Sequence, residues 1–398
     1  MRTCSPAVGT HQSAAVPALV VLVLGALVLG TSELAVAGLL PAISADLKVS
    51  TGTAGTLVSA YAVAVALLGP VLTALTSHLS RRQVLVGALV ALAVGNGVTA
   101  LAAYFPALLA ARVLTGTAAA MYAVTALTLA TTLTGPERRG RAVAIVFGGI
   151  TVSAVVGVPA SILLGGLFGW RAVYGVLAAL TMGVLVTAVR LVPEPAPAPP
   201  SSLLIQLKAL VRARLLVTFT INAVVTAGNY TASTYFVALL TQQTGLSTTT
   251  ASALLLTSGV SGTVGNIAGG TAVDQHARHA LLATMALLAT SLILIPLVMT
   301  SPVLTWLVAL IWAAAFNAFS TAAQGNVSLQ ARPATDVATA ANISVFNIGI
   351  AGGSAAGGLV LHLAGFTGIA LAGAALVIAG LNTALLFLPS QRKPSTRT

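Results

Sequence analysis

Two ionisable residues fall inside long apolar runs of this sequence. Of the six acidic residues, Glu33 is the one inside such a run, and Arg112 is the one cation so placed. An ionisable side chain within a membrane-spanning segment costs several kcal/mol and by default indicates function. Burial favours the neutral form of a carboxyl group, whereas a nearby arginine favours the charged form. Glu33 is therefore predicted to take up and release a proton.

Other side chains suggest little catalytic chemistry. The single cysteine, Cys4, excludes internal disulfides and a cysteine-based metal cluster. Metalloprotease, aspartyl protease and ATP-binding motifs are absent from the sequence. Ser261, within a Gly-Val-Ser-Gly segment, and His362 imitate a serine protease pair, but Ser261 is predicted mid-span and His362 near the outer surface. We expect no enzyme, catalytic residue, metal or cofactor, with an intramembrane serine protease as a remote alternative.

The composition is that of an all-α membrane protein. Hydrophobic residues make up 57% of the 398 and charged residues 6%, against about 25% charged in ordinary globular chains. Continuous apolar runs, rather than alternating patterns, favour helices over a β-barrel. Runs long enough to span a bilayer are predicted at 17–40, 52–75, 84–103, 107–133, 142–165, 172–191, 215–239, 248–272, 280–300, 303–325, 337–361 and 367–388.

The cations gather on one side of these spans. Lys48 and Arg171 fall on the outer side. Fifteen fall on the side of the N-terminus: Arg2, Arg81, Arg82, Arg138, Arg139, Arg141, Arg190, Lys208, Arg212, Arg214, Arg278, Arg332, Arg392, Lys393 and Arg397. Positive residues mark cytoplasmic loops, so both termini are predicted to be cytoplasmic. The net charge of +12 is thereby explained without a nucleic-acid partner.

The chain divides into two halves. Residues 17–192 and 215–388 are each predicted to form a six-helix bundle, flanked by cytoplasmic tails at 1–16 and 389–398. Residues 193–214 join them; Pro193 to Pro200 is proline-rich and extended, and Leu203 to Arg214 is either an amphipathic helix on the membrane face or an unstructured linker. The loops 73–82 and 270–279 correspond, which indicates a duplication typical of secondary transporters.

The order of several motifs resembles the major facilitator superfamily, in its branch of 12-span drug:proton antiporters with chloramphenicol and sugar efflux proteins. The loop from Gly270 through Asp274 to Arg278 has the spacing of that superfamily's loop motif, and the loop with Arg81 and Arg82 looks like a degraded copy. Further similar segments are Gly149, Gly157 and Pro159 of the fifth span, Arg112 to Gly116 of the fourth, Gly30 to Glu33 with Gly38 to Pro41, Ser59 to Tyr61, Pro70, Trp170 with Arg171, and Asn342 with Asn347.

The first loop motif departs from the family pattern. Ser77 stands where the family has an aspartate, and Thr73 stands where it has a glycine. A cytoplasmic latch built on that aspartate is therefore not expected in the first half. Asp274 with Arg278 is expected to carry that role.

The resemblance implies a proton-coupled exporter that works by alternating access in the cell membrane, acting as a monomer on a small amphipathic, chloramphenicol-like molecule. At 1.5 Å per residue, Glu33 and Arg112 lie about 10 and 8 Å from the same face. We therefore expect Glu33, as proton carrier, to interact with Arg112, although Arg112 reaching toward the interface is the alternative. A sugar or other metabolite exporter, or a uniporter, of the same fold remains open.

Packing and substrate residues are also predicted. Small residues allow membrane helices to approach closely, and the resemblance implies that glycines of spans five and eight seal the two halves together, with a bend at Pro159. The central cavity is expected to be mostly apolar with scattered polar groups, each of which could equally join helices. Its expected residues are Tyr61, Asn222, Asn229, Tyr230, Tyr235, Asn317, Gln324, Asn342 and Asn347.

Overall fold

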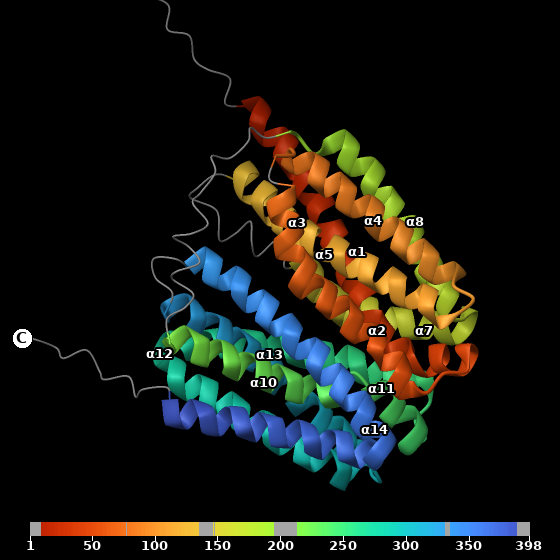
Figure 1. The fold of residues 1–398 in the computed structure, drawn as a ribbon, viewed down its shortest axis with the longest axis vertical. Helices are drawn as coiled ribbons and strands as arrows, with labels where there is room; N and C mark the ends of the chain where they lie inside the picture. Colours follow the sequence, from red (N-terminus) through yellow and green to blue (C-terminus); the bar gives the residue numbers. More distant parts are fainter. Residues whose placement is uncertain are drawn as a thin grey trace, which may run out of the picture.

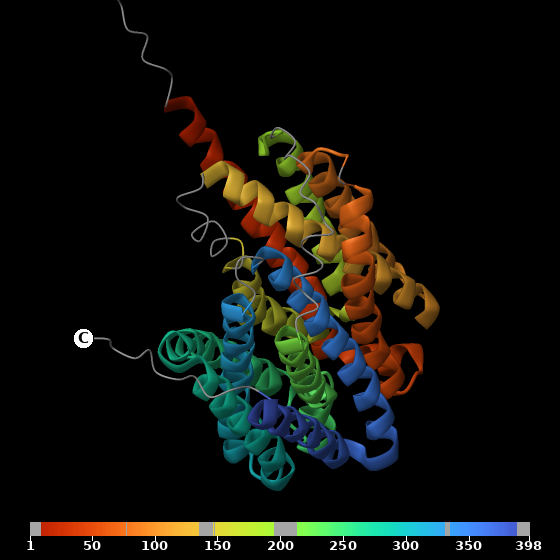
Figure 2. The ribbon, with the colours of Figure 1, turned by 60° about the vertical axis from the view of Figure 1, so that its left-hand side comes forward.

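A computed structural model describes residues 9–76, 78–134, 146, 148–194, 213–330 and 335–387. Its described part is helical apart from short connections. Two bundles, coloured red to yellow-green and green to blue, lie side by side in both views (Figures 1 and 2). They correspond to the two halves predicted from the sequence.

The first bundle begins with α1 (Gly9–Leu47), which starts eight residues before the predicted span. Its other elements are α2 (Thr51–Val63), η1 (Ala64–Leu68), α3 (Gly69–Leu75), α4 (Arg81–Leu101), α5 (Phe105–Thr134), η3 (Ser153–Gly157), α7 (Val158–Phe168) and α8 (Trp170–Leu191). The π-helical turns η1 and η3 directly precede Pro70 and Pro159, so the second and fifth spans are irregular. Proline removes a backbone donor and breaks regular α-helical bonding, which accounts for an irregular turn at each place.

The second bundle contains α10 (Ala213–Ser233), α11 (Phe236–Ala238), η4 (Leu239–Gln243), α12 (Thr248–Val298), α13 (Pro302–Gln330) and α14 (Thr335–Phe387). Helices α12 and α14 each contain two of the predicted spans. In α14 the chain folds back at Gly365, whose φ of 66° and ψ of −165° break the helix. Glycine adopts this left-handed backbone region without steric cost.

Helix α12 also reverses direction, although its backbone stays helical through residues 270–279, where the sequence predicts a loop. Trp306 Nε1 donates to Thr257 Oγ1 at 3.0 Å, and the adjacent Thr305 Oγ1 donates to the Val298 carbonyl at 2.9 Å. A straight helix would separate Thr257 from Val298 by about 60 Å. The two ends of α12 therefore lie together, and the turn between its segments is tight.

Equivalent helices pack against each other in the same way within each half. A Cβ at Gly157 would lie 2.2 Å from Thr31 Oγ1, and a Cβ at Gly357 would lie 2.4 Å from the Thr231 carbonyl oxygen. Both pairs are 126 residues apart. The first span therefore packs against the fifth as the seventh packs against the eleventh, which supports the duplication predicted from the sequence.

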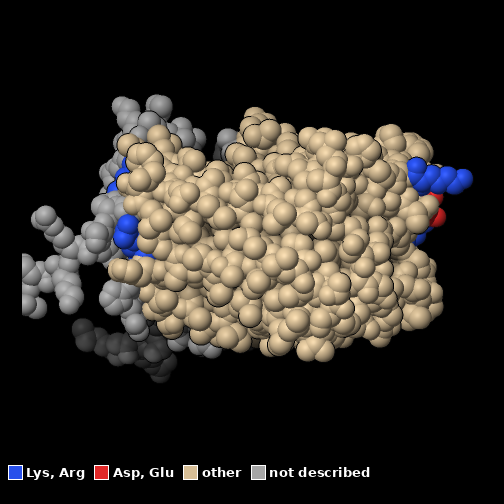
Figure 3. Space-filling view, turned by 90° about the horizontal axis from the view of Figure 1, so that it is seen from below, with Lys and Arg blue, Asp and Glu red and all other residues tan. Residues whose placement is uncertain are grey.

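An uncharged belt separates the charged ends of the molecule. Nine described stretches are long and apolar enough to cross a membrane. One of them, Ala341–Phe387, contains two crossings because of the fold at Gly365. The more polar α10 and the first segment of α12, which the sequence predicts to be spans, are not among the nine. Figure 3 shows Lys and Arg side chains at both ends of one face, acidic side chains at one of these ends, and no charged side chain in the belt between them.

Candidate functional site

Glu33, Tyr61 and Arg112 meet in the interior of the first bundle. Tyr61 Oη of α2 donates a hydrogen bond of 3.1 Å to the Glu33 carboxylate on α1. Arg112 of α5 does not pair with that carboxylate. Its guanidinium instead donates to the backbone carbonyls of Ser32 at 2.9 Å, Glu33 at 3.3 Å and Leu57 at 3.4 Å. Arg112 thus joins three helices, and the predicted contact with Glu33 is made through the backbone.

The arginine is held within the protein rather than reaching toward the membrane surface. Arg112 is 1% exposed, and its guanidinium carbon lies 4.5 Å from the centre of the Tyr61 ring. A guanidinium over an aromatic face gains a cation–π attraction, which strengthens when water is excluded. One turn along α5, a Cβ at Gly116 would lie 2.5 Å from the Tyr61 carbonyl oxygen, so the glycine permits this close approach. The alternative of an arginine at the interface is wrong.

A second polar contact lies beside this group and was not singled out from the sequence. Ser32 Oγ donates to Asn96 Oδ1 of α4 at 2.6 Å, and Asn96 is fully buried. In the sequence, Asn96 is a lone amide within an apolar run. Because a buried polar group requires a hydrogen-bond partner, this position could have been predicted to contact another helix. The contact ties α4 to the residue next to Glu33.

Three aromatic side chains of the second bundle form a cluster, and two of them, Tyr230 and Phe346, pack against the hydrophobic core that contains Tyr61 of the first bundle. Tyr230 of α10 stands edge-on to Phe316 of α13 and Phe346 of α14, with ring centres 5.9 and 6.4 Å away. Phe316 and Phe346 stack at 6.0 Å. Tyr230 lies close enough to Glu33 for the two side chains to interact electrostatically. Tyr230 was predicted as a substrate residue, whereas the two phenylalanines were missed because a lone phenylalanine in an apolar span carries no signal.

The predicted amides join helices of the second bundle. Asn222 Nδ2 donates to Asn342 Oδ1 at 2.6 Å, and Asn342 Nδ2 donates to Gln324 Oε1 at 2.7 Å, which links α10, α14 and α13. Asn229 Oδ1 accepts from Trp312 Nε1 at 2.8 Å.

The last two predicted amides bond within their own helices. Asn317 and Asn347 donate to the carbonyls of Ala313 and Ile343, four residues earlier. Most of the described hydrogen bonds of these amides therefore serve packing between or within helices.

The two halves meet through the second and eleventh spans. Ser59 Oγ donates to the Ala351 carbonyl at 3.0 Å, and Ser354 Oγ donates to the Gly55 carbonyl at 2.9 Å. Tyr235, predicted to line the cavity, is fully buried and donates to the Ser354 carbonyl at 2.8 Å. A Cβ at Gly55 of the first half would overlap the Tyr235 hydroxyl, so Tyr235 belongs to the contact between the halves.

The motif glycines do not seal the halves together as expected. Gly149 and Gly157 face Val23 and Thr31 of α1, within their own half. Gly265 and Gly269 of α12 likewise face Ala314 and Ala318 of α13. Only Gly259, among the glycines expected in this seal, meets the other half, where its Cβ would lie 2.9 Å from Val155 Cα. The fifth and eighth spans do meet across the halves, as expected, but most of these glycines face a helix of their own half. Glycine spacing indicates a close approach without indicating which helix is the neighbour.

The loop-motif arginines occupy equivalent places in both halves. Arg82 Nη2 donates to the Val189 carbonyl at the end of α8, and Arg278 Nη2 donates to the Leu385 carbonyl at the end of α14 at 3.5 Å. Cations favour helix C-termini, where carbonyls lack partners. Arg81 begins α4 and Gly270 lies in α12. Ser77 and the side chain of Asp274 lie outside the described residues, as does most of the linker.

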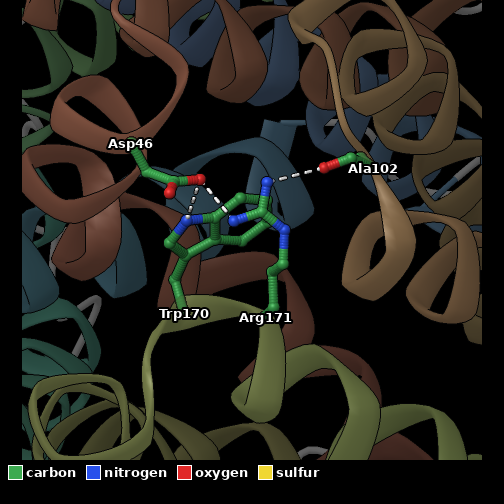
Figure 4. A network of polar contacts seen from close by, with 4 residues as sticks. All are labelled: Asp46, Ala102, Trp170 and Arg171. Carbon is green, nitrogen blue, oxygen red and sulfur yellow. Dashed lines mark hydrogen bonds and ion pairs between the residues drawn. The ribbon is translucent and has the colours of Figure 1, made fainter.

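The opposite end of the first bundle carries a polar clamp (Figure 4). Arg171 of α8 pairs with Asp46 of α1 and donates to the Ala102 carbonyl at 2.9 Å. Trp170 Nε1 donates to the same carboxylate at 3.3 Å, and its ring stacks under Arg171. The clamp ties together the ends of three helices, which gives the Trp170–Arg171 pair of the sequence a structural role.

Ser261, the serine of the protease alternative, donates a hydrogen bond to the Leu310 carbonyl at 2.8 Å.

An apolar hollow of about 330 Å³ lies between η3 and α12, where the two halves face each other. It is lined by Thr151, Val152, Val155, Val156, Val260, Thr263 and Val264. None of these was predicted as a site residue. The hollow adjoins the contact between Gly259 and Val155 and carries no ionisable group.

Comparison with known proteins agrees with this architecture. Residues 22–233 match the model of the Major Facilitator Superfamily. The uncharacterized MFS-type transporter YtbD of Bacillus subtilis (strain 168) is 33% identical over 375 residues, covering 91% of this chain and 94% of its own. A chloramphenicol resistance protein of Streptomyces lividans is 38% identical over 224 residues, 55% of this chain and 57% of its own.

A solved structure confirms the predicted fold class. The inward-facing, occupied form of a bacterial homolog of the human lysosomal transporter Spinster has a TM-score of 0.78 at 17% identity, covering 95% of this chain and 98% of its own. At that identity the likeness establishes the fold alone. From these matches and the helical architecture, this chain belongs to the major facilitator superfamily and is a multi-pass membrane transporter of small molecules, not an enzyme.

Proposed function

We propose that this transporter exports a small amphipathic, chloramphenicol-like molecule in exchange for protons, with Glu33 as the proton carrier. The observation that carries the proposal is the placement of Glu33 in a membrane-spanning helix, with Tyr61 bonded to its carboxylate and Tyr230 of the other half close enough to interact with it. The chloramphenicol resistance protein of Streptomyces lividans adds support for the substrate class.

The geometry suggests how the carboxyl group serves both states. When Glu33 is ionised, Tyr61 Oη donates to it. When Glu33 is protonated, the charge is gone and the cost of a carboxylate in the membrane disappears. Arg112 remains bonded to backbone carbonyls in this arrangement, so loss or gain of the proton changes the charge of the site by one unit without breaking those bonds.

Driving force and orientation complete the proposal. One charge moving through 100 mV releases about 2.3 kcal/mol, and a tenfold concentration ratio costs about 1.4 kcal/mol. One proton per cycle therefore supports export against a substantial gradient. We place both termini in the cytoplasm of a monomer in the cell membrane, since the cations gather on that side.

The test uses Glu33→Gln in inverted membrane vesicles with a pH-sensitive dye. Wild-type vesicles should show proton movement when substrate is added, and the glutamine variant should show none, because it cannot ionise. Glu194→Gln is the matched control, since Glu194 is exposed beyond the end of α8. Proton movement in Glu33→Gln equal to wild type would reject Glu33 as the carrier.

The same vesicles separate the alternatives. Wild-type transport that ignores the proton gradient would establish a uniporter. Transport of sugars without transport of chloramphenicol would establish a sugar exporter of the same fold.

A further inference from the structure

The aromatic residues Tyr230, Phe316 and Phe346, hereafter the aromatic triad, come from three different helices of the second bundle. Their rings pack at 5.9–6.4 Å with two edge-on contacts and one stack. Such arrangements are favourable among aromatic rings. The triad is therefore an ordered surface rather than three independent side chains.

The triad is less covered than the structural aromatic residues beside it. All three side chains are only partly buried. Phe319, which stacks on Phe316 at 6.4 Å, is fully buried, and Phe236 is 7% exposed against Trp312. The covered phenylalanines complete the core of the second bundle, whereas the triad leaves aromatic surface open. Tyr230 and Phe346 pack against the hydrophobic core that contains Tyr61 of the other half, and Tyr230 lies within electrostatic reach of Glu33.

The charges at this place balance without a ligand. Glu33 and Arg112 are the two ionisable side chains predicted within the spans, and their ionised forms cancel. Because Arg112 is bonded to backbone carbonyls and lies over Tyr61, its charge stays in place. A bound cation would leave an unbalanced positive charge in a poorly solvated site, which is costly. A neutral molecule avoids this cost.

The Glu33 carboxylate adds one requirement. It accepts a hydrogen bond from Tyr61 and has further lone pairs to offer. A hydroxyl or amide N–H of a ligand can donate to those lone pairs, which a proton on Glu33 would otherwise occupy. Binding of such a donor and protonation of Glu33 therefore exclude each other in part.

We propose that the aromatic triad, together with Glu33 and Tyr61, binds the substrate, and that the substrate is an electroneutral molecule with an aromatic ring and a hydroxyl or amide donor. The ring lies against the triad and the donor bonds to Glu33. This inference rests on the proposed export function and names the substrate class of the same site. It makes Phe316 and Phe346 specificity-determining residues.

The test is equilibrium binding to the purified full-length protein in detergent at one pH, with three probes. Chloramphenicol is neutral and carries an aromatic ring and hydrogen-bond donors, tetraphenylphosphonium is an aromatic cation without donors, and lactose is neutral and has donors but no aromatic ring. Chloramphenicol should bind at least about tenfold more tightly than the other two. Phe346→Leu and Phe316→Leu, which keep the bulk but remove the ring, should each weaken its binding about tenfold.

Phe168→Ala serves as the control, because Phe168 is 70% exposed at the end of α7, and its binding should equal wild type. Tighter binding of tetraphenylphosphonium or lactose, no binding of any probe, or unchanged chloramphenicol binding in both leucine variants would overturn the inference. The assay involves no proton gradient. Its failure is therefore distinguishable from a failure of proton coupling in the Glu33→Gln vesicles.

Discussion

At the scale of single residues, Arg112 is set apart by the number of its bonds rather than by its charge alone. Three guanidinium nitrogens reach carbonyls of α1 and α2, and lysine has one nitrogen to replace them. Arg112→Lys should therefore lose at least one of these bonds, since an ammonium cannot span the three carbonyls as the planar guanidinium does, at about 1.5–3 kcal/mol for each bond lost. We expect a lower melting temperature in detergent and at least about tenfold slower transport.

Arg190→Lys is the matched control, because Arg190 is exposed in the last turn of α8. Its melting temperature and transport should equal those of wild type. If Arg112→Lys also had the melting temperature and transport rate of wild type, a positive charge at this position would be enough for both. The separate bonds to the three carbonyls would then not be required.

At the scale of helices, neighbouring glycines of α14 differ in what they face. A Cβ at Gly353 would lie 2.2 Å from the Ala227 carbonyl oxygen of α10, whereas a Cβ at Gly352 would meet nothing within 4 Å. Gly353→Ala should push α10 and α14 apart and destabilise the protein by about 1–3 kcal/mol. Gly352→Ala should be neutral or stabilising by up to about 1 kcal/mol, because alanine favours helix.

Thermal unfolding of the two variants in the same detergent measures this difference. The comparison is internally matched, since one residue separates the two sites and the chemical change is identical. Equal melting temperatures would mean that the helices adjust to the added methyl group and that their close approach is not required.

At the scale of the whole molecule, the cycle requires the contacts between the halves to open. A Cβ at Gly166 of α7 would lie 3.4 Å from Thr248 Cγ2 of α12. Since a cysteine sulfur can take the place of Cγ2, a small adjustment of the two helix ends brings the sulfurs of two cysteines within bonding distance. Gly166→Cys with Thr248→Cys, in a Cys4→Ser background, should cross-link under oxidation. Transport should then stop, because the two halves can no longer separate there.

Reductant should restore transport, and each single-cysteine variant should transport under both conditions. Mass spectrometry of the intact chain and gel mobility report whether the cross-link has formed. Full transport by a completely cross-linked protein would show that this pair of helix ends does not move during the cycle.

The sequence by itself determined the membrane-spanning helices, the duplication, and the presence of Glu33 and Arg112 within spans at similar depth. These follow from local hydropathy and from spacing along the chain. The motifs that resemble the major facilitator superfamily lie along the same spans, and the fold that they imply is confirmed by the structural comparison.

Only the tertiary structure decided which side chains meet. It placed Tyr61 rather than Arg112 on the Glu33 carboxylate, turned Gly157 toward α1, and gathered Phe316 and Phe346 beside Tyr230. Spanning helices that are apolar on all sides carry no stripe that tells which face is packed. Such contacts depend on each helix's rotation and on neighbours far away in the chain, which no local pattern encodes.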